Sequence, residues 1–377
     1  MKVGIITCWY KNLSTANYSY NLCTALSKKV DLKIVSSHCS CIRYFVDKKD
    51  IFQSRCEIVS FPPYIYVLEP DNMPKIFHFI SRLIMLLLQF LRGIVYLTKC
   101  KDVDIIHYQQ TSAYPFGMAP LSIILMVPTK KIRVVTVHRF GLLSGLLSHL
   151  YRNADKIIVH SSDMKRKLKS FGVPESKIAL VPHGAEFPSL MKLPRKEITF
   201  FGSPSEAKGF PTILRALKLL KNQRRKLHLN VYGFYTEEEK NKAIGWAKNI
   251  GVSDMLIWGG RLSEEEFRRK MQQSIFTLAV YQYYVSGSSL ITRALGNATP
   301  VIASRVGGIP EYLGDAGLLV PKNDPEALAT AMTELLDNEL LGRRLAEEGR
   351  KRAKAISWDN IAKITLNIYY ELIHQKI

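Results

Sequence analysis

Short apolar runs alternate with amphipathic stretches in the first half of the chain. Residues 3–7, 32–35, 105–107 and 133–138 are largely apolar, as expected for strands buried on both faces of a parallel sheet. Between the first two runs, residues 15–29 repeat apolar and aromatic side chains at helical spacing and end in basic residues. Strand, helix and strand in this order predict a right-handed crossover and a parallel sheet.

The same alternation starts again at residue 197. Strand-like runs at 197–202, 227–233 and 255–260 are separated by helical patterns, and Pro188 and Pro194 flank a predicted linker. A chain of 377 residues is long enough for two cores. We therefore expect an α/β fold with domains at 1–187 and 188–356, and a final helix at 357–377 that crosses back to the first domain.

Residues 276–312 place a Ser/Gly loop at the start of a helix. The loop is Ser286, Gly287, Ser288 and Ser289, between a predicted strand and a helix that ends at Gly296-Asn297. Backbone N–H groups and the positive end of a helix dipole would suit an anion such as a diphosphate. An ordinary N-capped helix explains the same residues.

Residues 74–99 form the most apolar stretch of the chain. They contain Arg82 and Arg92, which is unfavourable for a transmembrane helix. On a helical wheel one polar, mostly basic stripe collects Lys75, His78, Arg82, Gln89, Arg92 and Lys99. Such a helix could pack on the domain's sheet as a crossover helix, or lie in a membrane interface with its cations on anionic headgroups.

Composition adds a strong charge signal to this picture. The apolar content of 47% is ordinary, but the formal net charge is +21 and the pI is about 9.6. This charge suggests an anionic partner such as a nucleotide, an anionic membrane surface or nucleic acid. The alternative is a Lys-rich surface without a specific role. Nucleic-acid binding rests on the charge alone, because no zinc-finger, RNP or helix-turn-helix pattern is present.

Neither cysteines nor carboxylates indicate a metal site. All six cysteines fall within the first 100 residues, without a Cys-x-x-Cys pair, and His38-Cys39-Ser40-Cys41 is too compact for zinc. We expect reduced thiols in a cytoplasmic protein without a signal peptide. Asp102 and Asp104 precede a strand, whereas ligands of parallel sheets bind at the carboxyl ends, so we expect a strand entry.

Two segments carry a family resemblance. TPVIASRVGGIPEYL at 299–313 resembles the donor-site segment of the retaining glycosyltransferases of family 4, and VPHGAEF at 181–187 resembles the end of their first domain. The resemblance implies the GT-B fold, in which two doubly wound Rossmann-like domains face a cleft. The first would be on the acceptor side and the second would bind the nucleotide sugar.

The resemblance also implies roles for individual residues. Lys208-Gly209 matches the family's phosphate-binding Lys-Gly, and His138 matches a His that contacts sugar or acceptor and is the implied catalytic residue. The implied donor-binding residues are Gly202, Ser203, Lys208, Gly233, Arg261, Leu262, Ser286, Gly287, Ser288, Ser289, Arg293 and Glu311. The implied acceptor-binding residues are Asn12, Ser14, Thr15 and His183. Alternatively, His138 is structural, Ser14 caps a helix and Lys208 is a solvated loop cation.

The sequence departs from the family at several of these positions. Val285 and Arg293 stand where the family usually has a pair of Glu residues, and Ser203 stands where it has an Arg. Leu13 and Ser14 replace a Gly pair. Arginine cannot accept the ribose hydrogen bonds that the second Glu would accept. We hypothesise that Arg293 replaces the missing cation near the donor phosphates.

The resemblance implies a metal-independent enzyme without a cofactor. It would move a hexose from a UDP-, GDP- or ADP-linked sugar to an acceptor hydroxyl with retention of configuration. Charge and the apolar helix suggest a lipid-linked or polymeric glycan acceptor, and a cytoplasmic, peripheral location on the inner face of a membrane. The alternative is a non-catalytic GT-B partner subunit that has lost donor-site residues.

Overall fold

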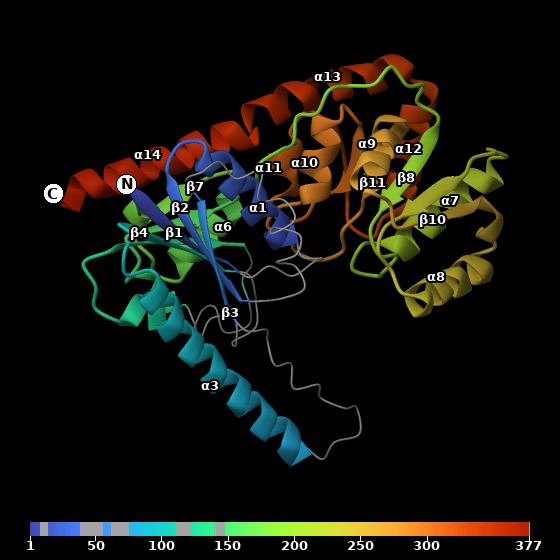
Figure 1. Cartoon of the computed structure of the whole chain (residues 1–377). Coiled ribbons are helices and arrows are strands. Elements are labelled where there is room, and N and C mark those ends of the chain that lie inside the picture. Colours follow the sequence, from blue (N-terminus) through green and yellow to red (C-terminus); the bar gives the residue numbers. More distant parts are fainter. Residues whose placement is uncertain are drawn as a thin grey trace. The chain divides into compact units, whose positions relative to one another are not determined.

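The chain forms two compact units (Figure 1). The computed structural model describes residues 1–7, 14–37, 56–61, 75–110, 121, 123–138, 140 and 148–376. One unit consists of Met1–Pro182 together with Trp358–Ile377, and the other of His183–Ser357. The division after residue 182 lies five residues before the predicted boundary, and each unit is an α/β structure with a parallel sheet.

The described part of the first unit contains a seven-stranded sheet in the order β3-β2-β1-β4-β5-β6-β7. All pairs are parallel, and Ile5 in the centre lies opposite both Ile34 and His107. The bounds are β1 Lys2–Thr7, β2 Asp31–Ser37, β3 Cys56–Phe61, β4 Ile105–Gln110, β5 Ile132–Val137, β6 Lys156–Val159 and β7 Ile178–Leu180.

Helices pack against this sheet from both the start and the end of the chain. The C-terminal helix α14 packs on α1, and Tyr18 and Tyr369 are among the largest fully buried side chains. The helical bounds are α1 Ser14–Ser27, α3 Lys75–Lys99, α5 Ser148–Tyr151, α6 Ser162–Ser170, η2 Glu175–Lys177 and α14 Trp358–Lys376. The chain end therefore belongs to the core of the first unit.

Helix α3 is packed unevenly. Near its C-terminus, Tyr96, Leu97 and the following Cys100 join the core of the first unit. Earlier along the described part of the helix, five large apolar side chains are exposed: Ile84 by 46%, Leu87 by 60%, Leu91 by 49%, Ile94 by 48% and Val95 by 36%. Over the described residues, no helix combines the length and the hydropathy that crossing a bilayer requires.

The second unit contains a six-stranded parallel sheet in the order β10-β9-β8-β11-β12-β13. The strand order reverses between β8 and β11, and ligands of doubly wound sheets bind beyond the carboxyl ends at such a point. The bounds are β8 Glu197–Phe201, β9 Leu229–Tyr232, β10 Leu256–Gly260, β11 Ser274–Ala279, β12 Val301–Ser304 and β13 Gly317–Val320.

Helices cover both faces of this second sheet. The larger apolar cluster packs Phe210, Ala243 and Leu328 of α7, α8 and α12 on one face. The other cluster packs side chains of α9, α10, α11 and α13. The bounds are α7 Phe210–Asn222, α8 Glu237–Ile250, η3 Ser253–Met255, α9 Glu264–Gln272, α10 Ser289–Gly296, α11 Ile309–Leu313, α12 Pro325–Asp337 and α13 Glu339–Ala355.

Candidate functional site

Glycines bring the backbone together at the carboxyl ends of β8, β9 and β10. The N–H of Gly202 donates to Tyr232 O, and that of Gly233 donates to Gly260 O, both at 2.8 Å. A Cβ on Gly233 would lie 2.7 Å from Gly202 O, and both glycines have φ above +130° (+139° and +148°). Glycine is required here, and the edge stays open to close approach by a ligand.

The loop between β8 and α7 is tied to the segment that follows β11. Gly209 has φ +70°, and a Cβ there would lie 1.9 Å from Val280 O. The N–H of Gln282 donates to Ala207 O at 3.1 Å. These contacts hold Lys208, whose ammonium lies 4.4 Å from the centre of the Tyr281 ring. Within the described chain no carboxylate forms an ion pair with Lys208.

Tyr281 also contacts the start of α10. Its hydroxyl lies 2.7 Å from Ser288 Oγ, and Ser288 caps the helix by accepting the Ile291 N–H. The first N–H groups of a helix have no partner inside it. One tyrosine therefore connects an ammonium on the β8 side with a helix N-terminus on the β11 side, across the reversal of strand order.

Two further contacts hold the Ser/Gly loop. A Cβ on Gly287 would lie 3.1 Å from the Tyr312 hydroxyl, which accepts the His183 N–H at 3.0 Å. Gly308 N–H donates to Val285 O at 2.9 Å, and Gly307 leaves no room for a side chain beside that carbonyl. The structure thus brings the predicted loop together with Lys208 and His183.

Other predicted donor residues are engaged elsewhere in the second unit. Ser203 donates its hydroxyl hydrogen to Glu239 at 2.8 Å. Arg293 forms an ion pair with Glu264, lies 3.8 Å from Glu186, and stacks 3.6 Å above the centre of the Phe267 ring. A nucleotide phosphate would compete with these two carboxylates for Arg293.

The nucleobase side of the predicted site consists of the segment after β10. Arg261 lies 5.8 Å from the Phe234 ring, which is 58% exposed. Leu262 packs on the adjacent core cluster. Glu311 lies in α11, where its backbone carbonyl accepts the Arg352 guanidinium. An exposed ring beside a guanidinium could stack a base.

In the first unit, His138 belongs to a buried polar chain. Its Nδ1 lies 3.0 Å from Nε2 of His160, whose Nδ1 donates to Val181 O at 3.0 Å. Its Nε2 lies 2.9 Å from the Gln109 carbonyl oxygen. Both ring nitrogens of His138 are therefore hydrogen-bonded. A substrate group that needs a ring nitrogen of His138 would have to displace Gln109 or His160 from it.

The chain continues from Gln109 to α14. The Gln109 amide nitrogen lies 3.1 Å from His107 Nε2, and His107 Nδ1 lies 2.5 Å from the Tyr369 hydroxyl. Burial lowers the pKa of His107 to about 3, which keeps it neutral. The sequence prediction missed His107, Gln109 and His160. Polar residues at alternate positions of the apolar β4 run were the available signal.

The structure describes only some of the predicted acceptor-binding residues. Asn12 lies outside the described residues, and Ser14 and Thr15 begin α1 with side chains that are also outside them. His183 belongs to the second unit, where burial lowers its pKa to about 4 although its Nδ1–H donates to Gly184 O. It is therefore a neutral group behind the Ser/Gly loop.

The carboxylates, thiols and cavities add little to this site. Asp102 pairs with Lys2 and Lys33, and in the described ranges no cluster of His, Cys, Asp or Glu could hold a metal. Cys23, Cys56 and Cys100 are free thiols; Cys8, Cys39 and Cys41 lie outside the described residues.

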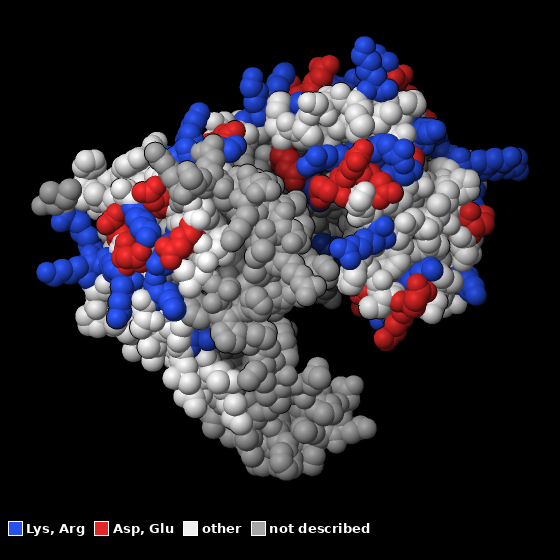
Figure 2. Space-filling model, viewed as in Figure 1, with Lys and Arg blue, Asp and Glu red and all other residues white. Residues whose placement is uncertain are grey.

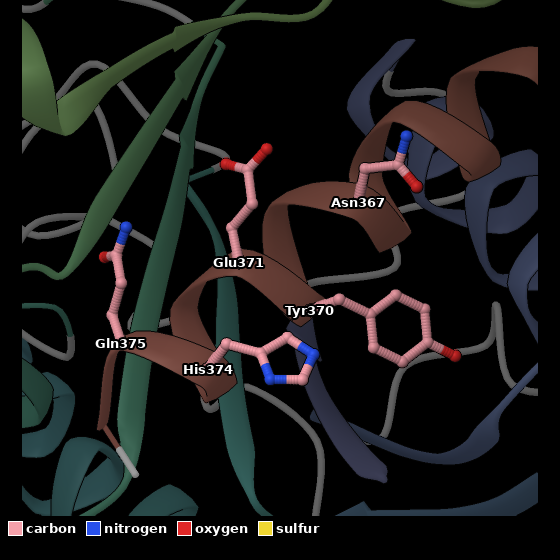
Figure 3. Close-up of a pocket in the computed structure, with 5 residues that line it drawn as sticks. All are labelled: Asn367, Tyr370, Glu371, His374 and Gln375. Carbon is pink, nitrogen blue, oxygen red and sulfur yellow. The ribbon is translucent and has the colours of Figure 1, made fainter.

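A cavity in the first unit lies apart from these residues. Figure 3 shows that its drawn lining comes from α14 alone, namely Asn367, Tyr370, Glu371, His374 and Gln375.

Comparisons with known proteins identify the family of the chain. The family model described as "Glycosyltransferase Family 4" matches residues 15–186, and "Glycosyl transferases group 1" matches residues 185–352. An MMP alpha-(1->4)-mannosyltransferase of Mycolicibacterium hassiacum is 27% identical over 225 residues, covering 58% of this chain and 54% of the relative. A D-inositol 3-phosphate glycosyltransferase of Streptomyces avermitilis is 24% identical over 240 residues, covering 57% and 52%. The chain spans about half the length of these curated relatives.

Solved structures show the same fold over nearly the full length. A glycosyltransferase of Rickettsia africae superposes with a TM-score of 0.75 at 17% identity, covering 99% of this chain and 98% of that one. HepE of Anabaena, solved with UDP-glucose, has a TM-score of 0.73 at 11% identity and coverage of 98% and 100%. The two family models adjoin at residues 185–186, close to the division between the two units. The chain belongs to the family 4 glycosyltransferases of the GT-B fold.

Proposed function

We propose that the protein is a retaining glycosyltransferase that moves a hexose from a nucleotide-sugar donor to an acceptor hydroxyl. The supporting observation is the pair of groups on Tyr281: the Lys208 ammonium over its ring and the α10 N-terminus at its hydroxyl. Retention of configuration comes from the resemblance to the family. Nucleotide sugars fit because they combine a diphosphate with a base and a sugar.

In this proposal the second unit stabilises the leaving group. Negative charge develops on the diphosphate as the glycosidic bond breaks, and preorganised donors lower the energy of that state. Lys208 supplies a cation, and Ser289 and Leu290 supply N–H groups at the positive end of α10. These groups do this without a metal ion or a cofactor.

The base of the donor would lie near Arg261 and Phe234. Relatives in the comparison include a mannosyltransferase and inositol phosphate glycosyltransferases, and the Anabaena structure holds UDP-glucose. UDP is therefore the first nucleotide to test, followed by GDP and ADP. The exposed Phe234 ring is the feature of this chain that favours a stacked base.

Binding of UDP, GDP and ADP to the purified full chain tests the donor site. We expect Lys208→Met to weaken binding of the preferred nucleotide roughly 10- to 100-fold, the equivalent of one charge-assisted hydrogen bond. Lys242→Met is the matched control, because Lys242 also lies over an aromatic ring, that of Trp246 at 5.2 Å. Equal affinities for wild type and Lys208→Met would refute the donor site.

The competing function is that of a partner subunit that binds without catalysis. Its supporting observation is that Ser203 and Arg293 already have carboxylate partners, whereas the apolar side chain of Val285 carries no hydrogen-bond acceptor. Hydrolysis of a panel of nucleotide sugars separates the two functions. Turnover supports the transferase, and nucleotide binding without any turnover supports the subunit.

We also propose a lipid-linked or polymeric glycan acceptor and contact of α3 with an anionic membrane surface. The described exposed side chains Ile84, Leu87, Leu91 and Ile94 follow helical spacing along one face. The whole helix contains Lys and Arg but neither Asp nor Glu. Figure 2 shows the described part of this helix as a mostly uncharged surface. Apolar contact plus cations suits anionic headgroups.

A further inference from the structure

A second cavity lies in the second unit, beside the candidate donor site formed by Lys208, Tyr281 and the Ser/Gly loop. It has a volume of about 540 Å³, in the range of small-molecule sites, and is formed by the loops after β8, β11 and β13 together with α7 and α8. Gln282 belongs to its lining, whereas the preceding residue Tyr281 contacts Lys208 and Ser288. The cavity and the candidate donor site therefore use the adjacent residues Gln282 and Tyr281 of one segment.

A hydrogen-bonded network holds the floor of this cavity. Thr212 is buried, and its hydroxyl lies 3.2 Å from the Asn323 side-chain oxygen. The Arg215 guanidinium donates to the same oxygen at 2.8 Å. Asn323 has φ +55°, a backbone state that Asn tolerates better than most residues. An otherwise flexible guanidinium is thus oriented before any ligand binds.

The charge of the lining favours an anion. Arg215 and Lys322 are cations, and no carboxylate within the described chain forms an ion pair with either. Glu206 is the only carboxylate in the lining as described, and Lys242 lies 3.7 Å from it. A planar guanidinium with a nearby ammonium suits a phosphate group.

The remaining lining suits a polyol with an apolar face. Trp246 and Tyr283 contribute aromatic rings, and Tyr283 is 65% exposed. The C–H face of a sugar ring packs well on such rings. The Asn323 side-chain oxygen already accepts from Thr212 and Arg215, so Asn323 offers its NH2 group as a donor to a hydroxyl. The Gln282 side-chain oxygen can accept from one.

We propose that this cavity binds a phosphorylated saccharide. The phosphate would bind Arg215 and Lys322, the sugar hydroxyls would bind the Gln282 and Asn323 amides, and the ring would lie on Trp246 or Tyr283. The proposal is independent of the donor function, because none of these residues belongs to the predicted donor set. A nucleotide with the same phosphate would present a flat base and fewer hydroxyls, and it is the alternative that the test excludes.

Calorimetric titration of the full chain with glucose 6-phosphate, glucose, inorganic phosphate and AMP tests this site. We expect glucose 6-phosphate to bind at least 10-fold more tightly than each of the other three. Arg215→Met should weaken that binding at least 10-fold, and Trp246→Ala should weaken it measurably. Arg343→Met is the matched control, because Arg343 is an exposed helical Arg paired with Glu339 on α13, and it should change the affinity less than twofold.

The remaining outcomes each contradict the proposal. Phosphate binding as tightly as glucose 6-phosphate would mean a simple anion site, and tighter AMP binding would mean a nucleotide site. Loss of glucose 6-phosphate binding in Lys208→Met would place the ligand in the candidate donor site instead.

Two controls accompany these measurements. An unchanged melting temperature for Arg215→Met establishes that its loss of glucose 6-phosphate binding is local. UDP affinity measured on the same variants separates the test of this cavity from the test of the donor function.

Discussion

Tyr281 shows how single residues organise the candidate donor site. Its ring faces Lys208 and its hydroxyl meets Ser288, so it fixes a cation and a helix cap together. Its side chain is almost fully buried, at 5% exposure. Among the described residues no carboxylate pairs with Lys208, so its ammonium above the ring is available to an anionic ligand. Tyr281 is therefore a positioning residue for the phosphate-binding groups.

Arg293 is the residue whose role is most open to a direct test. Following the sequence hypothesis, we expect Arg293→Ala to weaken nucleotide binding roughly 10-fold, the scale of one charge-assisted contact. Titration with UDP, GDP and ADP measures this. If the variant binds nucleotide normally but melts at a lower temperature, Arg293 only joins α9 to α10 through Glu264 and Phe267, and the hypothesis is rejected.

Residue roles followed from the sequence only where local spacing defines them. The capping box that begins α9 can be read directly from the sequence, because Ser263 and Glu266 lie a single turn apart. The partners of Ser203 and Arg293 lie 36 and 29 positions away. Such contacts depend on tertiary packing, which a pattern of residue types does not specify.

At the scale of elements, periodicity predicted most of the helices and strands. The predicted helix at 15–29 is Ser14–Ser27, and the predicted strand at 255–260 is Leu256–Gly260. The edge strand β3, Cys56–Phe61, was missed. An edge strand pairs on one side only, so its apolar pattern is weaker than that of the buried centre.

Helix α3 gives the prediction that belongs to this scale. We expect the wild-type chain to sediment with vesicles that contain anionic lipid, and Leu87→Glu/Leu91→Glu to reduce that partitioning at least 10-fold. Each buried leucine contributes about 1.5–3 kcal/mol, which the charged variant loses. Vesicle co-sedimentation at several salt concentrations measures this.

The control for α3 is Leu340→Glu, since Leu340 on α13 is 77% exposed. It should leave vesicle binding unchanged. Binding of the double variant at the wild-type level, or absence of wild-type binding to anionic vesicles, would contradict a membrane role for α3. Insensitivity to salt would contradict the contribution of its cations.

At the scale of the whole molecule, the two parallel sheets and the helices between their strands were predictable. Short apolar strands and amphipathic helices alternate in both halves of the chain. The polar chain through the first unit was not predictable. It joins residues of β4 and α14 with His138 and His160, which directly follow β5 and β6, and its members are up to 262 positions apart. Its members look like ordinary polar residues until the sheet brings them together.

Buried histidines predict how the fold responds to acid. His107 has a pKa of about 3 when folded against an ordinary value of 6.5, so the unfolded chain binds a proton that the folded chain does not. The contribution of neutral His107 to the free energy of unfolding is therefore fully present above pH 6.5. It falls by about 1.4 kcal/mol per pH unit as the pH drops from 6.5 towards 3. His183 adds the same trend down to about pH 4.

Chemical denaturation between pH 7.5 and 5 measures this effect. We expect His107→Gln to be less stable at neutral pH but to lose less stability on acidification than wild type. The conservative variant Gln109→Asn keeps His107 and should retain the wild-type slope. Equal slopes for wild type and His107→Gln would mean that His107 does not control the acid response.

The polar chain also couples proton content to the direction of one amide. His160 Nδ1 donates to Val181 O, so a Gln109 side-chain oxygen that faces His138 calls for a third N–H hydrogen on the two imidazoles, and the pair would then carry one positive charge. Turning the Gln109 amide by half a rotation makes it a donor to His138, and the pair is then neutral. The same turn would set the Gln109 oxygen against His107 Nε2, which Thr136 Oγ1 also contacts at 2.7 Å. The His107 hydrogen would then lie on Nε2, and the Tyr369 hydroxyl would donate to Nδ1. A proton gained at the end of β5 would thus be registered by the C-terminal helix as a reoriented hydroxyl, without any movement of the backbone.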